Sequence, residues 1–338
     1  MKVVAYYRLK GLVVEERPMP RLEPDEVLVK VVNVGFCGSD HSMVESGTLK
    51  DGTVLGHEVS GFVEDTGRDV KGVEKGIRVI IRPTYCGKCR ECLMGKPYLC
   101  QVNRRSIGIG DLDGAFAEYV KVFPDMLIPV PGEVDYVNAA LAEVFATSLH
   151  GLKCSRASKG SALIIGGGAV GLALLEILKL YNFGPICLSE PFEHKRELAK
   201  KLGADAVFNP MEQDFHQEIA AFTGLKGFDT VFECSGANGA IQDAMGMVSV
   251  GGTVCILSMI MRDVTIVPIT INFKELWLTA AYSNTHEENK ICLEHMRKAE
   301  LDGRPFVSDY VSLDELPRVY KERINTGQAI KVMIKIDG

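Results

Sequence analysis

Apolar positions in the first part of the chain repeat at the short spacing of β-strands. Residues 27–34, V-L-V-K-V-V-N-V, are rich in β-branched side chains and predict a strand that ends at Gly35. Short apolar runs at 59–63 and 78–81 follow, separated by frequent glycines, and no stretch of helical period precedes about residue 90. This pattern predicts a small antiparallel β-barrel.

A different pattern begins near residue 147, where short apolar strands alternate with segments of helical period. Such alternation predicts an α/β fold with a doubly wound parallel sheet. The predicted strands lie at residues 161–165, 186–190, 206–209, 229–234, 253–257 and 276–282, and the predicted helices at 172–180, 193–202, 212–222 and 239–250.

The chain has 338 residues, which is long enough for two domains. Because the parallel sheet is complete before residue 287, we assign residues 1–146 and 287–338 to one domain and residues 147–286 to the other. Outside the sheet the pattern predicts strands within 113–120 and 330–336 and helices at 138–150, 287–301 and 313–323.

The turn between the first strand and the first helix of the parallel sheet is rich in glycine. It reads G-G-G-A-V-G and contains the spacing G-x-G-x-x-G, which in this context is typical of a dinucleotide site. The glycines permit a tight turn and a close approach of the pyrophosphate, whose charge the helix N-terminus favours. The predicted binding residues are Gly166, Gly168, Ala169, Val170 and Gly171.

Glu190 ends the next predicted strand, 19 positions after Gly171. An acidic residue there is expected to bond both ribose hydroxyls of NAD, and it would repel the 2′-phosphate of NADP. Lys195 and Arg196 lie close enough in sequence to soften that repulsion, so NADP stays open as an alternative. A solvated carboxylate at a strand end is the plainer interpretation of Glu190.

Five of the ten cysteines lie in patterned contexts. Two successive C-x2-C steps and a fourth cysteine predict a structural zinc site in a lobe at residues 86–100, which would lose its fold without the metal. Two disulfides or four unbound thiols are the alternatives. The lobe contains Cys86, Cys89, Cys92 and Cys100, whereas Cys154, Cys187, Cys234, Cys255 and Cys292 are expected to be packing residues.

A second group combines a thiol, Cys37, with an imidazole, His57, and a carboxylate, Glu58. These are the side chains that bind zinc, and three protein ligands with one open position describe a catalytic site. Glu143 lies among apolar neighbours on a predicted helix, where it could be a capped, partly exposed carboxylate. Because a buried carboxylate needs a positive partner, the nearby metal motif favours Glu143 as a further ligand.

The net charge of −6 argues against nucleic acid or an anionic membrane as a partner. The sequence contains no run of about 18 apolar residues, so we expect no membrane span. The start, M-K-V-V-A-Y-Y-R, lacks the apolar core of a signal peptide, so we expect a cytoplasmic protein.

Together these motifs resemble the zinc-dependent medium-chain alcohol dehydrogenase family, in its sorbitol and threonine dehydrogenase-like branch. The resemblance rests on residues 56–70, G-H-E-V-S-G-F-V-E-D-T-G-R-D-V, on the four-cysteine lobe, on C-G-S-D and on the glycine-rich turn. It implies a barrel domain like that of the GroES chaperonin and a Rossmann domain. It also implies a catalytic zinc held by Cys37, His57 and a carboxylate, with Glu143 at the third-ligand position and Glu58 a direct or exchanging ligand.

The resemblance assigns further roles residue by residue. Ser39 matches the hydroxyl residue that passes on the alcohol proton, Thr147 and Val170 match residues that press on the nicotinamide, and Lys195 matches a basic residue at the adenosine ribose. The chain departs from the family where a relay histidine is usual, since Ser42 stands there. His41, one place earlier, is either the relay or a surface histidine, and Val144 stands where the branch usually has proline.

The resemblance implies an oxidoreductase that transfers hydride from a secondary alcohol or polyol to NAD and gives a ketone. It implies a small-molecule substrate, two zinc ions, and a homodimer or homotetramer. Two alternatives stay open, a zinc-independent quinone or enoyl reductase of the same fold and a non-catalytic NAD-binding protein. About two zinc ions per chain would favour the dehydrogenase, because the rivals have no use for an open metal site.

Overall fold

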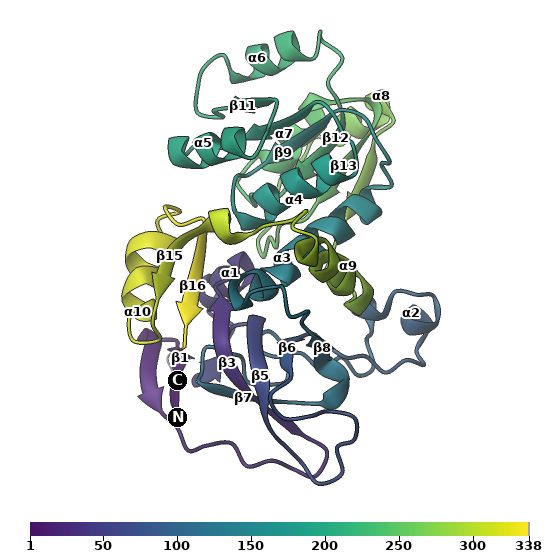
Figure 1. Ribbon diagram of the computed structural model, residues 1–338. Helices are drawn as coiled ribbons and strands as arrows, with labels where there is room; N and C mark the ends of the chain where they lie inside the picture. The colour runs from purple at the N-terminus through teal and green to yellow at the C-terminus, as the bar shows by residue number, and fades with distance from the viewer. Residues whose placement is uncertain (337–338) are drawn as a thin grey trace. The chain divides into compact units, whose positions relative to one another are not determined.

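The computed structural model describes residues 1–336, which form two compact units (Figure 1). One unit contains Met1–Glu143 and the segment from Asn284 onward, and the other is Val144–Ser283. Both divisions fall three residues before the positions expected from the sequence. No helix among the described residues is both long and apolar enough to span a lipid bilayer.

The first unit is built on a seven-stranded sheet of order β15-β16-β3-β5-β6-β8, in which β7 pairs with the first half of β3. Its pairs are antiparallel except β15 with β16, and a smaller sheet has the order β2-β1-β4. The strands are β1 (Lys2–Tyr7), β2 (Gly11–Glu16), β3 (Val27–Gly35), β4 (Thr53–Val54), β5 (Glu58–Thr66), β6 (Arg78–Ile81), β7 (Tyr119–Val122), β8 (Leu127–Pro129), β15 (Val307–Val311) and β16 (Lys331–Lys335).

The register between β3 and β5 positions the candidate metal ligands. Gly35 at the end of β3 lies opposite Glu58 at the start of β5. The chain leaves β3 toward Cys37 and enters β5 from His57, so the pairing brings the two segments together. Alternate valines of β3 are buried in the core of the unit, which fixes the register because a one-residue slip would turn them outward.

A helix, α1 (Gly38–Ser46), follows β3, and the expectation of no helix before about residue 90 is wrong. The sequence G-S-D-H-S-M-V-E-S has too few apolar residues to show a helical period. Capping starts the helix instead, because the Cys37 amide donates to Asp40 Oδ2 at 3.0 Å and the Ser39 amide to Cys37 Sγ at 3.5 Å. Gly47, with φ of 62°, ends it in the left-handed conformation.

The other helices of the first unit differ from prediction mainly at their ends. The predicted helix at 138–150 is longer and becomes α3 (Tyr136–Ser155), within which the two units divide. The lobe contains the short α2 (Arg90–Leu93), and α9 (His286–Arg297) begins with a capping box at Thr285. The predicted helix at 313–323 is α10 (Leu316–Val319) followed by a π-helical turn, Tyr320–Ile324.

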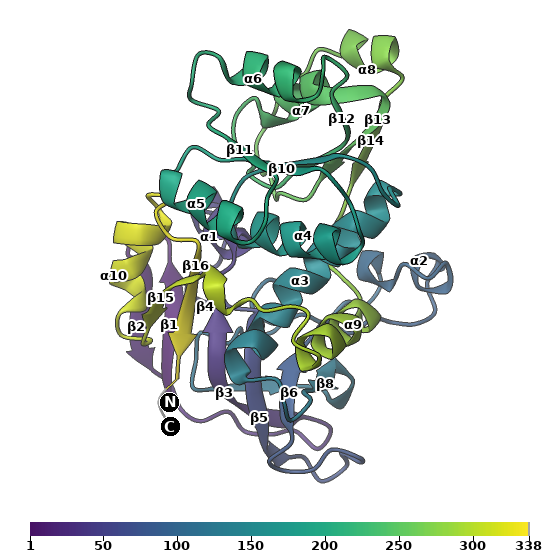
Figure 2. The same ribbon diagram turned by 45° about the horizontal axis from the view of Figure 1, so that its top comes forward.

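The second unit is a six-stranded parallel sheet of order β11-β10-β9-β12-β13-β14, which confirms the predicted doubly wound sheet. Helices α4 and α5 pack on one face, and α6, α7 and α8 on the other (Figure 2). The elements are β9 (Ala162–Ile165), α4 (Ala169–Leu180), β10 (Ile186–Ser189), α5 (Glu193–Lys201), β11 (Ala206–Phe208), α6 (Phe215–Phe222), β12 (Phe228–Glu233), α7 (Ala240–Met247), β13 (Val248–Ile256), α8 (Ile269–Lys274) and β14 (Trp277–Ala280).

Candidate metal centres and dinucleotide site

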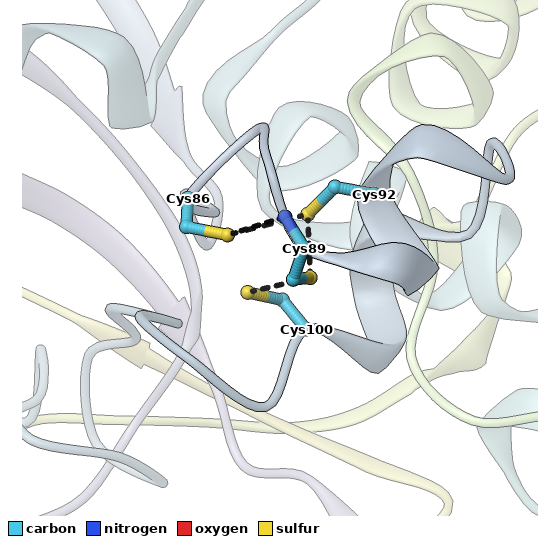
Figure 3. Close-up of side chains that lie close together, drawn as sticks. All are labelled: Cys86, Cys89, Cys92 and Cys100. Carbon is cyan, nitrogen blue, oxygen red and sulfur yellow. Dashed lines mark hydrogen bonds between the residues drawn. The ribbon is translucent and has the colours of Figure 1, made fainter.

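The four cysteines of the lobe point their sulfurs toward one another (Figure 3). Cys89 Sγ lies 3.4 Å from Cys92 Sγ and 3.8 Å from Cys100 Sγ, and Cys86 Sγ lies 3.9 Å from Cys92 Sγ. A tetrahedron with zinc–sulfur bonds of about 2.3 Å has sulfur–sulfur distances of about 3.8 Å. The donor set therefore fits a closed, structural zinc site.

The charges that the four cysteines would carry as thiolates also favour a bound cation. Burial opposes ionisation of Cys100, but the backbone amides of Cys86, Asn103 and Val102 outweigh burial and lower the pKa of its thiol to about 6. The Cys92 amide favours the Cys89 thiolate, yet burial and the neighbouring sulfurs outweigh that amide and raise the pKa of Cys89 to about 12. Four thiolates this close need a metal to neutralise them. All ten cysteines lie in the described part of the chain, and none forms a disulfide.

Cys37, His57 and Glu58 form a second group. One ligand atom from each lies within 4.8 Å of the other two. The carboxylate of Glu58 reaches this position because it passes close over Gly35, where a Cβ atom would lie only 2.1 Å from Glu58 Oε2. The glycine opposite Glu58 is thus required by the approach of its carboxylate.

Two side chains of α1 face the His57 ring. Asp40 Oδ1 lies 3.4 Å from His57 Nδ1, and Ser39 Oγ lies 3.4 Å from His57 Nε2. Burial lowers the pKa of His57, but the charges of Asp40 and Cys37 outweigh burial and raise it well above its ordinary value. A carboxylate on one ring nitrogen fixes the tautomer of a histidine that binds metal through the other.

Glu58 is paired with a lysine from the last strand. Lys331 Nζ donates to both carboxylate oxygens of Glu58, at 2.8 and 2.6 Å, and to the carbonyl of Phe36 at 2.9 Å. The side chains of Lys331 and Glu58 are 3% and 1% exposed, so neither charge is stabilised by solvent. Each ion is therefore needed by the other.

Glu143 lies in a different set of contacts. Its Oε1 is 3.2 Å from the guanidinium of Arg82 and accepts a hydrogen bond from Asn284 Nδ2 at 2.9 Å. Burial raises the pKa of Glu143, but Arg82, His57 and Asn284 outweigh burial and lower it. In the part of the chain that the structure describes, Glu143 does not belong to the group of Cys37, His57 and Glu58. Its assignment as a ligand stays a prediction.

His41, the second candidate for proton relay, contacts a different residue from Ser39. His41 Nδ1 lies 3.2 Å from the hydroxyl of Tyr320, which in turn donates to Glu45 Oε1 at 3.1 Å. Residues two positions apart on a helix do not face each other, which explains why Ser39 reaches His57 while His41 reaches Tyr320. The relay role of His41 stays a prediction.

The glycine-rich turn of the second unit has the geometry that its sequence predicts. Gly166 adopts φ of 108°, a conformation that favours glycine, and a Cβ at Gly171 would lie 1.9 Å from the Gly166 carbonyl. Gly168 is the N-cap of α4, which begins at Ala169 and Val170. Ser148, next to Thr147 on α3, donates to the Val170 carbonyl at 3.0 Å.

Glu190 lies immediately after β10 and is buried. Its Oε2 accepts a hydrogen bond from the Gly167 amide at 2.7 Å, and its Oε1 accepts from the Phe192 amide at 3.1 Å. The plainer interpretation, a solvated strand end, does not describe this residue. Lys195 lies 4.8 Å from the ring centre of Phe192, and burial lowers the pKa of Lys195 more than Glu190 raises it.

Comparison with known proteins gives matches on both units. The alcohol dehydrogenase GroES-like domain matches residues 23–132, and the zinc-binding dehydrogenase family matches residues 169–297. The L-threonine 3-dehydrogenase of Pyrococcus horikoshii is 35% identical over 78% of both chains. The chain belongs to the zinc-binding alcohol dehydrogenase family.

Other members of the family match nearly the whole chain. The sorbitol dehydrogenase of Bacillus subtilis is 29% identical over 99% of this chain and 97% of that protein. A solved zinc-binding dehydrogenase from Sinorhizobium meliloti, bound to NADP, is 30% identical with a TM-score of 0.88, covering 99% of this chain and 98% of that one. Membership confirms the predicted family and fold class and favours an alcohol or polyol dehydrogenase over the two alternatives.

Sequence reasoning missed four residues around the second group, Asp40, Lys331, Arg82 and Asn284. The sequence offers a signal for two of them, Lys331 and Arg82, because a buried Glu58 or Glu143 requires a cation. That rule says a partner exists without saying where in the chain it lies.

Proposed function

We propose that this protein is a zinc- and NAD-dependent dehydrogenase that oxidises a secondary alcohol or polyol to a ketone. The observation that carries the proposal is the convergence of a thiol, an imidazole and a carboxylate within 4.8 Å of one another, with the Ser39 hydroxyl beside the imidazole. Cys37, His57 and Glu58 would hold the catalytic metal, and the four-cysteine lobe the structural one.

The charges around the group support a divalent ion. With Cys37 as thiolate, four anionic groups lie here (Cys37, Asp40, Glu58 and Glu143) against two cations, Lys331 and Arg82. The excess of two negative charges is what one divalent ion neutralises, while His57 stays uncharged as a ligand. A zinc ion held there would supply Lewis acidity, which strongly lowers the pKa of a bound hydroxyl group.

The chain's own residues orient the reactants and handle the proton. Asp40 holds the ring of His57, and Lys331 holds the carboxylate of Glu58, so that the ligand atoms keep their positions. Ser39, whose hydroxyl lies 3.4 Å from His57 Nε2, accepts the proton of the substrate alcohol and passes it outward.

For the cofactor we propose NAD. The buried carboxylate of Glu190 lies against the Gly167 amide, where it favours ribose hydroxyls and opposes a 2′-phosphate. The Sinorhizobium meliloti relative is bound to NADP, so the choice needs its own measurement. We expect kcat/KM to be higher with NAD than with NADP, and the reverse preference would contradict the role given to Glu190.

The substrate class rests on the relatives. Sorbitol and L-threonine, the substrates named for two of them, both carry a secondary alcohol. Secondary alcohols, polyols and hydroxy-amino acids should therefore be screened by the absorbance of reduced nicotinamide. No turnover with any of these classes, from a protein loaded with both zinc ions, would count against the proposal.

We also propose a homodimer or homotetramer in the cytoplasm. Strand β14 lies at the edge of its sheet, and Trp277 and Leu278 on it are 60% and 37% exposed. A second copy pairing antiparallel along β14 would cover these side chains and satisfy the open backbone groups. Sedimentation should show dimers or larger species that Trp277→Arg shifts to monomers. An unpaired monomer at micromolar concentration would refute this part.

Metal analysis tests the central proposal. We expect about two zinc ions per chain, and Cys37→Ser should lose one of them together with turnover while the fold survives. An active Cys37→Ser enzyme, or a wild-type protein that binds one zinc, would refute the catalytic zinc.

A further inference from the structure

Glu233, the last residue of β12, is a buried carboxylate that the metal centres do not use. Its exposed fraction is 0%. Its Oε1 accepts hydrogen bonds from the amides of Ser235 and Gly236, at 2.8 and 2.7 Å, and from the Ser235 hydroxyl at 2.6 Å. Its Oε2 accepts from the hydroxyl of Ser258. Four donors directed at two oxygens describe an ionised carboxylate.

The charge of Glu233 has no partner of opposite sign in the protein. In the part of the chain that the structure describes, Glu233 forms no ion pair, whereas the equally buried Glu58 is paired with Lys331. Arg262 approaches the same loop, but it is exposed to solvent and donates to the Gly236 carbonyl. Because a buried charge is normally paired, this site favours a ligand that brings a positive charge.

Glu233 lies where the strand order of the parallel sheet reverses, between β9 and β12. It is in register with Ile165, the residue before Gly166. A Cβ atom at Gly166 would lie 3.0 Å from Ser235, so the loop after β12 packs against the glycine-rich turn. A dinucleotide lies across such a reversal, with one mononucleotide on each half of the sheet. The role proposed for Glu190 assigns the adenosine half to β9–β11, which leaves the nicotinamide half to β12–β14.

The two redox states of the cofactor differ in charge at this half alone. The oxidised nicotinamide ring is a cation and the reduced ring is neutral, while the pyrophosphate carries the same charge in both. We propose that the buried charge of Glu233 shifts binding toward NAD and away from NADH, so that this residue determines the selectivity of the site between the two redox states. This inference rests on NAD as the cofactor of the proposed function.

The test is Glu233→Gln in the zinc-loaded protein. Glutamine has the same size, its amide oxygen can accept from Ser235 and Gly236, and its nitrogen can donate to the Ser258 hydroxyl, so the substitution removes the charge and keeps the loops. Calorimetry measures Kd for NAD and for NADH. Because unit charges about 10 Å apart at an effective dielectric constant of about 20 change a binding constant roughly tenfold, we expect the ratio of Kd for NAD to Kd for NADH to rise roughly tenfold.

Two further variants complete the design. Asp229→Asn is the matched control, since it removes a charge from the other end of β12, where Asp229 Oδ2 accepts from the amide and hydroxyl of Ser161. Ser258→Ala keeps the charge of Glu233 and removes its link to the loop after β13. Both variants should keep the ratio of the two dissociation constants within about threefold of the wild-type ratio.

An unchanged ratio in Glu233→Gln, or an equal loss of affinity for NAD and NADH, would overturn the inference. A roughly tenfold rise of the ratio in Ser258→Ala would assign the preference to loop position and would also overturn it, even if Glu233→Gln does not fold. A wild-type protein that binds neither NAD nor NADH would instead refute the proposed function, so the two failures are distinguishable.

Discussion

The two candidate metal centres draw their donors from the chain in opposite ways. The lobe takes four identical sulfurs from residues 86–100, and these lie within 4.8 Å of one another. The group of Cys37, His57 and Glu58 takes three different donors, and its charges are completed by Lys331, 273 positions away from Glu58. In the lobe, the metal takes the role that a hydrophobic core has elsewhere. The ligands of the second group are instead held in place by the surrounding strands and side chains.

The contrast predicts different responses to metal loss. In the lobe the energy of binding zinc is also folding energy, so loss of the metal should unfold it locally. The ligands of the second group are fixed by strand pairing, capping and ion pairs, and these persist without the metal. The first centre should therefore affect stability and the second should affect turnover.

The largest effect is expected from Cys89→Ser. Structural zinc sites contribute about 10–16 kcal/mol in isolated peptides, so the lobe should lose its zinc and unfold locally. Proteolysis within residues 86–100, together with metal analysis, measures this. Cys154→Ser, a half-buried cysteine outside both centres, is the control. A variant that resists proteolysis as well as the wild type would break the comparison.

Cys37→Ser should act in the opposite way. Loss of the Lewis acid is expected to lower kcat roughly 10³-fold or more, equivalent to about 4 kcal/mol of transition-state stabilisation. The midpoint of thermal unfolding should stay close to that of the wild type. If instead the variant unfolds as readily as Cys89→Ser, the second centre is also structural.

Lys331→Met tests whether the fold balances the charge of Glu58. Removing one partner of a buried ion pair costs about 3–5 kcal/mol, and we expect a loss of this size in denaturant unfolding of the zinc-free protein. Lys335→Met on the same strand, where the side chain is exposed, should cost less than about 1 kcal/mol. Equal losses of stability in the two variants would show that Lys331 does not stabilise the buried charge of Glu58.

Asp40→Asn should have a smaller effect, confined to metal retention. Asparagine keeps an oxygen for the Cys37 amide, so α1 should still form, but the carboxylate that orients His57 is gone. We expect zinc to be held roughly 10–100-fold less tightly in chelator competition. Unchanged affinity would show that the ring needs no carboxylate to hold its position.

The smallest effect is expected from His41→Asn. Because His41 contacts Tyr320 and not Ser39, kcat should fall by less than about threefold, which is under about 0.7 kcal/mol. A loss of tenfold or more in steady-state kinetics would restore His41 as the relay. Ser39→Ala serves as the comparison, since its hydroxyl lies beside His57.

The same contrast explains what the sequence could predict. The lobe and the glycine-rich turn are local, so spacing alone identifies them. Cys37, His57 and Glu58 lie within 22 positions of the sequence, and their side-chain types alone mark them as candidate zinc ligands. Lys331 begins a strand, and a lysine at such a position is normally expected to be exposed to solvent. It contacts Glu58 because β16 pairs with β3, which the sequence does not reveal. Arg82 and Asn284 meet through tertiary contacts that no local pattern encodes.

Helix α1 was missed for a related reason. Its start depends on a thiol and a carboxylate acting as caps, and neither residue changes hydrophobic periodicity. Polar helices of this kind are stabilised by their ends and by tertiary contacts, so a search for apolar repeats does not find them.

The pairing of Lys331 with Glu58 also has a consequence for synthesis on the ribosome. Residues emerge in order, and domains generally fold as they emerge. Strand β3 must wait for its partner β16, and Glu58 must wait for its cation, until all of Val144–Ser283 has been made. During translation the parallel sheet of Val144–Ser283 can therefore finish folding first, and the group of Cys37, His57 and Glu58 gains its buried cation only after that unit has been made.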